Sequence, residues 1–297
     1  MANKWAELVG RELEPESWAE CLSLLLSFGG SETIYRGHRS FNWELQSKLE
    51  RVLLKHAEEF DRHRYDLMQS MAVDRETDEW TESVEKYLTR YFRRNAIRYG
   101  TPGLPEPWDV VGWWEVMQHH GAPTRLMDWT TSPFVALWFA IDGHEDRAGD
   151  MALWIYDRRS GLINHGQAQI DADEAEDIDF LASDDRRAVN RFIRLAISDG
   201  NPALIPVQPR PFPRAVAQQS VLTVSPSISV GRPAHWWIRK SLATRVRLRA
   251  AWKSDIVMTC ESMGLNRPSL FRDLDTLGNF VTETFLSNAE EWPDAIS

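Results

Sequence analysis

The sequence predicts a single α+β domain built on one central β-sheet. Short apolar runs bounded by Gly, Pro and polar turns, typical of strands, occur among longer stretches with apolar residues at helical spacing. The 297 residues contain no internal repeat, no low-complexity tract and no clear linker, and a chain of this length can bury a sizeable core. We therefore expect a split, antiparallel sheet with helical insertions.

The N-terminal third is expected to supply one strand and several helices. Trp18, Cys21, Leu22, Leu25 and Phe28 share one face at helical spacing, which predicts an amphipathic helix over 15–28. A strand is predicted over 33–37, and the charged stretch 46–99 is read as a helical insertion.

The stretch Gln118–Ala140 organises the rest of the chain. It follows a predicted helix, Val110–His120, which Gly121 ends because glycine accepts the left-handed cap. A short buried strand is predicted from Thr124 to Trp129. Ser132 followed by proline predicts the cap of a new helix, and its apolar composition predicts burial on all sides.

The C-terminal half continues the alternation of strands and helices. The acidic stretch 171–185 is read as a surface loop or a lid. The predicted strands are Met151–Tyr156, Leu204–Val207, a turn and strand within 214–224, Trp236–Ile238 and Arg245–Arg249; the predicted helices are Arg186–Ile197, about 252–263 and a closing segment from Leu270 to Phe280. We place the domain at 31–285, with a helical lead-in over 1–30 and a tail over 286–297.

Composition narrows the classes of function. The formal net charge of -10 argues against broad nucleic-acid binding, although it leaves room for a local basic cleft. The two cysteines, Cys21 and Cys260, form no metal or disulfide motif, which favours a reducing cytoplasm. The longest apolar run near the N-terminus is too short to span a membrane. A soluble cytoplasmic protein is expected.

Local chemistry singles out two places. Thr130, Thr131 and Ser132 would bring hydroxyls and free N–H groups to a helix start, which suits an anionic or polar ligand. Arg36 stands beside Gly37, where the backbone can turn sharply and a guanidinium can bind phosphate or carboxylate. The structural alternatives remain open. In those, Ser132 only caps the helix, Asp128 only pairs with Arg125, and Arg36 pairs with a buried acid.

Several well-known catalytic motifs are absent. The sequence contains no GxxxxGK phosphate loop, no strand–GxGxxG–helix unit, no HExxH and no GxSxG. The nearest set of metal ligands is His119, His120 and Asp128, but adjacent histidines at a helix end point in different directions. We therefore expect no bound metal.

Four ordered motifs resemble the FRG domain, a bacterial family named for an aromatic-Arg-Gly signature. They are Tyr35-Arg36-Gly37 with the downstream Trp43, Leu45, Leu49 and Arg51; QHHGAPTRLMDWTTSPFVALWFA at 118–140; the block at 218–222; and Leu270–Asp275, where Arg272 replaces the usual Pro. The block at 218–222 also departs from the family, which usually has Gln, a small residue and an aromatic there.

The order of strands and polar residues also resembles ADP-ribosyltransferases, and this resemblance implies NAD as the substrate. It implies that Arg36 holds the diphosphate or ribose and that Thr130, Thr131 and Ser132 shape the nicotinamide pocket. Gln219, alone or together with Gln218, stands where those enzymes carry a glutamate, and a glutamine can supply neither a general base nor a negative charge. Gly37 and Arg125 are expected to join Arg36, Thr130, Thr131 and Ser132 in binding the cofactor. The expected catalytic residues are Gln219, Asp128 and His119.

Three readings of function follow. The first is an NAD-using ADP-ribosyltransferase or NAD glycohydrolase that acts as a toxin or phage-defence effector on an unknown macromolecular acceptor. The second is a non-catalytic module of the same fold that senses a nucleotide or other small anionic ligand. The third is a nuclease or other hydrolase using Asp128, Glu115 and His119.

Overall fold

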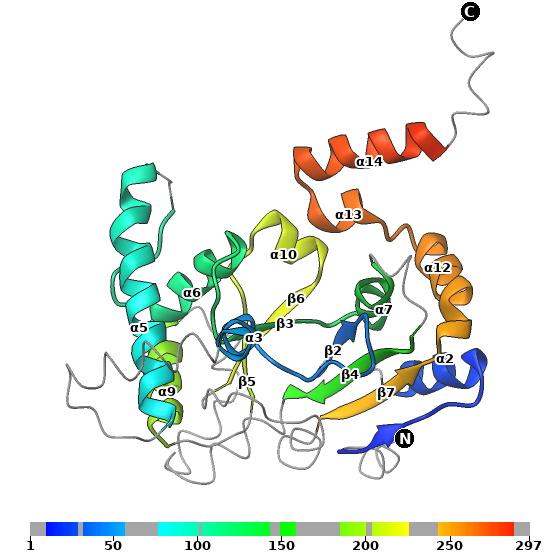
Figure 1. Ribbon diagram of the computed structural model, residues 1–297, viewed down its shortest axis with the longest axis horizontal. Coiled ribbons are helices and arrows are strands. Elements are labelled where there is room, and N and C mark those ends of the chain that lie inside the picture. The colour runs from blue at the N-terminus through cyan, green and yellow to red at the C-terminus, as the bar shows by residue number, and fades with distance from the viewer. Residues whose placement is uncertain are drawn as a thin grey trace, which may run out of the picture.

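The computed structural model describes residues 10–28, 32–56, 77–100, 103–142, 149–158, 185–199, 204–225 and 243–287. One seven-stranded sheet crosses the molecule in the order β1-β7-β4-β2-β3-β6-β5 (Figure 1). Its strands are β1 (Glu12–Leu13), β2 (Thr33–His38), β3 (Leu126–Thr130), β4 (Met151–Asp157), β5 (Ile205–Val207), β6 (Ser220–Val224) and β7 (Thr244–Leu248). All neighbouring strands are antiparallel except β1 and β7, which confirms the predicted α+β class.

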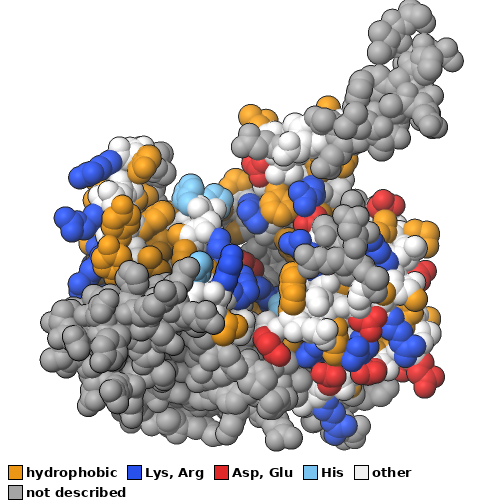
Figure 2. All heavy atoms as spheres, viewed as in Figure 1, with side chains coloured by type: hydrophobic (Ala, Val, Ile, Leu, Met, Phe, Trp, Pro, Cys, Tyr) orange, Lys and Arg blue, Asp and Glu red, His pale blue; other side chains and the backbone are white. Residues whose placement is uncertain are grey.

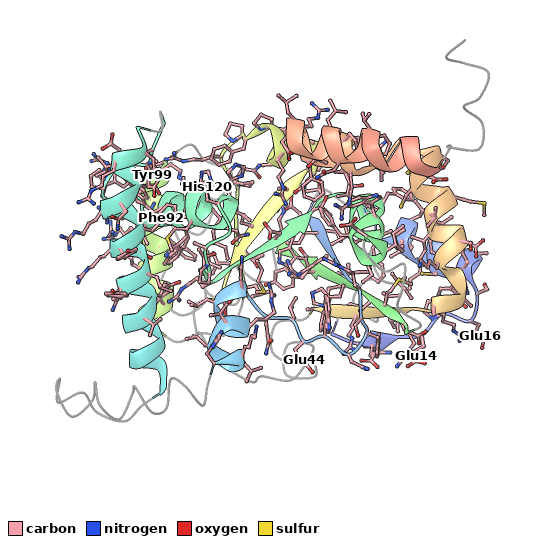
Figure 3. The ribbon with its side chains drawn as sticks, turned by 45° about the horizontal axis from the view of Figure 1, so that its top comes forward. Glu14, Glu16, Glu44, Phe92, Tyr99 and His120 are labelled. Atoms are coloured by element: carbon pink, nitrogen blue, oxygen red, sulfur yellow. The ribbon has the colours of Figure 1, made fainter. Side chains whose placement is uncertain are left out.

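Helices cover the sheet and its two ends. They are α2 (Trp18–Ser27), α3 (Lys48–Lys55), α5 (Thr77–Ala96), α6 (Val110–His119), α7 (Pro133–Ile141), α9 (Arg186–Asp199), α10 (Pro213–Ala217), α12 (Lys253–Ser262), α13 (Arg267–Phe271) and α14 (Leu274–Ser287), with short 3₁₀ turns η1 (Ile97–Tyr99) and η3 (Ala250–Trp252). Figure 3 shows Phe92, Tyr99 and His120 at the α5–α6 end and Glu14 and Glu16 at the opposite end.

The sheet is split between β2 and β3. β2 pairs with β4 over six residues and β3 pairs with β6 over five, whereas β2 and β3 share one register pair, Tyr35 with Thr130. Continuing that antiparallel register would place Gly37 opposite Asp128, but the strands have already diverged there. The two halves of the sheet therefore meet at a point and open a gap beside it.

The main core lies between the sheet and α7, α2 and α12. It contains Tyr35, Leu153, Ile155, Val246 and most of the apolar residues of α7. Gly37 fixes how closely α7 approaches β2, because a Cβ on Gly37 would lie 1.9 Å from the backbone oxygen of Ala136. Ser132 caps α7 through the N–H of Val135, and Pro133 follows at the first helical position, as predicted.

Several sequence predictions shift in detail. The helix predicted over 15–28 begins at Trp18, because Ser17 accepts a hydrogen bond from the N–H of Glu20. The strand predicted from Thr124 begins at Leu126. The closing segment is two helices, because Arg272 adopts a left-handed φ of 51° and ends α13. The stretches 171–184, 236–238 and 288–297, which include most of the predicted acidic loop and tail, lie outside the described residues.

Two arginines of β7 pack against the loop that follows β2. Arg245 is buried, and its guanidinium lies 3.7 Å from the centre of the Phe41 ring. Arg247 lies 3.6 Å from the same ring and forms salt bridges with Glu14 and Asp150. These cations hold the loop after β2 against β7 through ring stacking and ion pairing.

Across the described part of the chain, no helix combines the length and the apolar character needed to cross a bilayer.

Candidate functional site

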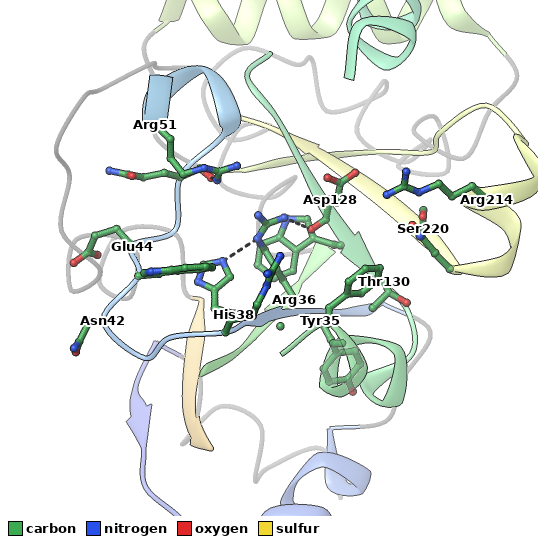
Figure 4. A pocket seen from close by; sticks show the side chains of 18 residues that line it. Tyr35, Arg36, His38, Asn42, Glu44, Arg51, Asp128, Thr130, Arg214 and Ser220 are labelled. Atoms are coloured by element: carbon green, nitrogen blue, oxygen red, sulfur yellow. Dashed lines mark hydrogen bonds between the residues drawn. The ribbon is translucent and has the colours of Figure 1, made fainter. Parts of the chain in front are cut away.

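A cleft of about 670 Å³ opens where β2 and β3 diverge (Figure 4). Its walls come from β2 and the segment after it, from β3, and from the α10–β6 region. The lining residues are Tyr35, Arg36, Gly37, His38, Arg39, Asn42, Trp43, Glu44, Gln46, Arg51, Asp128, Trp129, Thr130, Ala136, Phe139, Arg214, Gln218 and Ser220. A cleft of this volume is large enough for a nucleotide-sized ligand.

Arg36 spans the gap between the two halves of the sheet. Its Nη1 donates a hydrogen bond of 2.5 Å to the backbone oxygen of Asp128, the carbonyl that a regular β2–β3 ladder would have used. Its Nε donates to Nε2 of His38 at 3.0 Å. Within the described residues, Arg36 forms no salt bridge, so the alternative that it pairs with a buried acid is wrong for that part of the chain. The guanidinium is held in place by two neutral acceptors, the imidazole of His38 and the backbone oxygen of Asp128.

His38 is the second acceptor for Arg36. The two side chains lie two residues apart on β2 and therefore project from the same face of the strand. Burial, and then the charge of Arg36, hold the pKa of His38 well below its ordinary value. Burial likewise lowers the pKa of Arg36 to about 10, against the opposing effect of Asp128. A neutral imidazole beside a charged guanidinium is the stable combination.

The cleft is cationic although the protein is acidic. Arg39, Arg51 and Arg214 line it with Arg36, and Asp128 and Glu44 are its acidic lining residues. Figure 2 shows Lys and Arg side chains gathered around the hollow in the middle of this face. Because the formal net charge of the chain is -10, this concentration of arginines is a local feature that favours an anionic ligand.

Asp128 is held by Gln118 on α6 and, through Gln118, by Thr124 in the segment before β3. Gln118 Nε2 donates to Asp128 Oδ1 at 2.7 Å, and the hydroxyl of Thr124 donates to Gln118 Oε1 at 2.8 Å. Thr124 thereby fixes which end of the Gln118 amide faces the carboxylate. The alternative pairing of Asp128 with Arg125 is wrong, since Asp128 is hydrogen-bonded to Gln118 instead.

A second, smaller hollow of about 110 Å³ shares a wall with the cleft. The residues that line both are Asp128, Arg214, Gln218 and Ser220. The smaller hollow also contains His119, whose ring stacks on Phe212 with centroids 5.2 Å apart. Burial, then His120 and Arg214, lower the pKa of His119. Glu115 lines it too, but Arg186 and Arg210 engage its carboxylate.

The structure brings together part of the predicted site. Arg36, Gly37, Asp128 and Thr130 line the cleft, and His119 lines only the smaller hollow. Thr131, Ser132, Arg125 and Gln219 line neither.

All four of these side chains have hydrogen-bond partners within the fold. The guanidinium of Arg125 is buried and bonded to Glu85 through Nε at 2.8 Å and Nη2 at 2.5 Å. Ser132 caps α7, and the Thr131 hydroxyl donates to Oε1 of the exposed Gln219 at 3.3 Å.

Cleft residues that the sequence had not placed in a site include His38, Arg39, Trp43, Arg51 and Arg214. The alternation of side chains along β2 was a usable signal for His38, because the residue two positions after Arg36 faces the same way. Arg214 reaches the cleft only because β3 pairs with β6, which no local pattern reveals, whereas Gln218 had been considered together with Gln219. Among the described residues, no group of three or more His, Cys, Asp or Glu side chains is arranged to hold a metal ion.

Comparison with known proteins identifies one family. The family model of the FRG domain matches residues 31–149, so this chain contains an FRG domain. The matched segment supplies β2, β3, α7 and most of the cleft lining, whereas Arg214, Gln218 and Ser220 come from the chain beyond it. No curated protein and no solved structure matches the chain. The resemblance to ADP-ribosyltransferases stays a prediction.

Proposed function

We propose that the cleft of this FRG-domain protein binds a nucleotide that carries a diphosphate, with NAD as the first candidate. The observation that carries the proposal is Arg36, a cation held by a neutral histidine and a backbone carbonyl in a cleft with three further arginines. An arginine without a partner carboxylate among the described residues retains its capacity for two parallel bonds to phosphate oxygens. Arg51 and Arg39 add to the positive potential.

Aromatic side chains support a nucleotide rather than inorganic phosphate alone. Trp43 lines the cleft with 43% of its surface exposed, and its ring centroid lies 6.3 Å from that of His38. An exposed indole inside a cleft provides a stacking surface for a base. His38 contacts both Trp43 and Arg36, so the proposed stacking surface and the proposed phosphate-binding cation lie on two sides of one residue.

Asp128 is the residue we assign to catalysis on NAD. In this reaction the bond between C1′ of the ribose and the nicotinamide nitrogen breaks, and nicotinamide leaves with the bonding pair. Positive charge develops on the sugar, and water or an acceptor hydroxyl forms the new C–O bond and releases a proton. A fixed carboxylate stabilises such a charge and can take that proton. Gln118 and Thr124 hold Asp128 in one orientation, which suits this role.

A second candidate function is binding without turnover. The position of Gln219 favours it, because this residue replaces the glutamate expected from the resemblance and lies outside the cleft. The third reading, a hydrolase using Glu115, is less well supported, since two arginines engage that carboxylate. We retain NAD chemistry and ligand sensing as the two candidates for the same cleft.

Release of nicotinamide from NAD separates the two. Purified wild type, Arg36→Ala and Asp128→Asn are incubated with NAD, and free nicotinamide is followed by chromatography. Catalysis predicts release by wild type and a loss of about 100-fold or more in Asp128→Asn, in line with removal of one transition-state electrostatic contact. Arg94→Ala, which removes an exposed arginine of α5 outside the cleft, is the matched control.

The result has two clear outcomes. Nicotinamide release that survives in Asp128→Asn would contradict the catalytic assignment. Saturable NAD binding without release by wild type would establish the sensing function instead.

We further propose that NAD consumption makes the protein a toxin or phage-defence effector. Expression of wild type should then arrest growth and lower cellular NAD, whereas Asp128→Asn should do neither. Equal growth of the two strains at equal protein levels would contradict this role.

A further inference from the structure

Gln218 occupies the wall between the two hollows. It caps the end of α10, two residues before the first residue of β6, and it lines both the cleft and the smaller hollow together with Asp128, Arg214 and Ser220. A ligand anchored at Arg36 that extends past Asp128 would therefore meet Gln218 before it entered the smaller hollow.

The amide of Gln218 carries a hydrogen-bonding group that the fold leaves unused. The residue is 8% exposed, and its Nε2 is buried without a hydrogen-bond partner among the described residues. Leaving such a donor unsatisfied costs a folded protein stability. By contrast, Gln118 across the hollow has both ends of its amide bonded. The rotation that turns Nε2 of Gln218 toward the hollows breaks no hydrogen bond of that nitrogen.

The adjacent Gln219 has a different role. It adopts a left-handed φ of 47°, is exposed, and bonds with Thr131 through both its backbone oxygen and its side chain. Gln219 thus closes the turn between α10 and β6. This turn places Gln218 in the wall between the cleft and the smaller hollow. The two neighbours form a natural pair of test and control positions.

We propose that Gln218 is a ligand-recognition residue, whose Nε2 donates to an uncharged oxygen of a ligand that spans the cleft and the smaller hollow. This inference rests on the proposed nucleotide function and adds a second contact to it. The proposed acceptor is a hydroxyl or carbonyl oxygen, because Asp128 and Arg214 line the same wall and their opposite charges leave no net positive charge there for a second anion. The ligand therefore has an anionic part at Arg36 and a neutral polar part at Gln218.

Substitution of Gln218 by Leu tests the inference by two independent measurements. First, thermal unfolding of the ligand-free protein should show a Tm equal to or above that of wild type, because the substitution removes an unsatisfied buried donor. Second, calorimetry should show NAD binding weakened about tenfold, the effect of one hydrogen bond to an uncharged group, with pyrophosphate binding unchanged. Gln219→Asn, which retains a residue tolerant of the left-handed region, should leave both affinities unchanged.

Three results are decisive. A Tm lowered by several degrees in Gln218→Leu would show that Gln218 holds the fold, and it would overturn the inference. NAD affinity unchanged in Gln218→Leu, with wild type binding both probes, would overturn the inference and leave the proposed function intact. Wild type that binds neither NAD nor pyrophosphate would overturn the proposed function, and with it the assignment of this ligand to Gln218.

Discussion

Mild acidification should destabilise the protein through His38. In the folded state His38 is buried and lies beside the charge of Arg36, so its pKa lies well below 6.5, the value expected of an unfolded chain. As the pH falls below 6.5, the unfolded chain takes up a proton at this position and the folded protein does not. The stability that the neutral His38 contributes is therefore present above that pH and is lost as the pH falls toward the folded pKa.

The size of the effect follows from proton linkage. If the folded pKa is below the range tested, lowering the pH from about 7.0 to about 5.5 favours the unfolded state at this one site by about 1.3 kcal/mol. The measurement is the free energy of unfolding by urea at the two pH values, in wild type and in His38→Gln. Glutamine offers Arg36 an acceptor oxygen but does not titrate, so its stability should fall by about 1.3 kcal/mol less than that of wild type.

If wild type and His38→Gln lost the same free energy between the two pH values, His38 would titrate alike in both states. The description of a neutral histidine supporting Arg36 would then be wrong.

Three further predictions concern single side chains. Glu85→Ala should lower the free energy of unfolding by about 3–5 kcal/mol, because it leaves the buried Arg125 without its carboxylate; a loss below about 1 kcal/mol by urea titration would argue against a structural ion pair. Gly37→Ala should sharply reduce the yield of folded protein, because the added Cβ would meet the backbone of α7. Gly149→Ala is the control, because a Cβ there meets open space. Circular dichroism should show a native fold for Gly149→Ala only, and a native fold for both variants would contradict the prediction. Trp43→Ala should weaken ADP binding about tenfold or more and leave pyrophosphate binding unchanged, as expected of a stacking residue; equal weakening of both ligands by calorimetry would contradict that role.

The elements around the site could be predicted because their signals are local. Ser132 followed by Pro133 marks a helix start through the chemistry of the first turn, and the structure places the start there. The apolar run Met151–Tyr156 predicted β4 to within one residue. The split between β2 and β3 was expected as part of the fold class, but its location depends on a single register pair that no sequence pattern encodes.

Residues that line the cleft could be predicted where the sequence of a single strand identifies them. They were missed where their position depends on how strands pair. Arg36 and Asp128 stand in recognisable motifs, and both line the cleft. Gln218 and Gln219 are adjacent and chemically alike, so only the left-handed backbone of Gln219 decides which of them faces the cleft. Arg125 was misplaced for a related reason, because its partner Glu85 lies 40 positions away in the chain.

The most direct test of the central claim is calorimetric titration of NAD into wild type, Arg36→Ala and Arg94→Ala. The claim is that Arg36, held by His38 and the Asp128 carbonyl, anchors a nucleotide diphosphate. It predicts saturable binding to wild type and Arg94→Ala, with affinity reduced about tenfold to 100-fold in Arg36→Ala, the effect of losing charge-assisted hydrogen bonds. NAD binding of equal strength in all three proteins, or no binding to wild type, would contradict it.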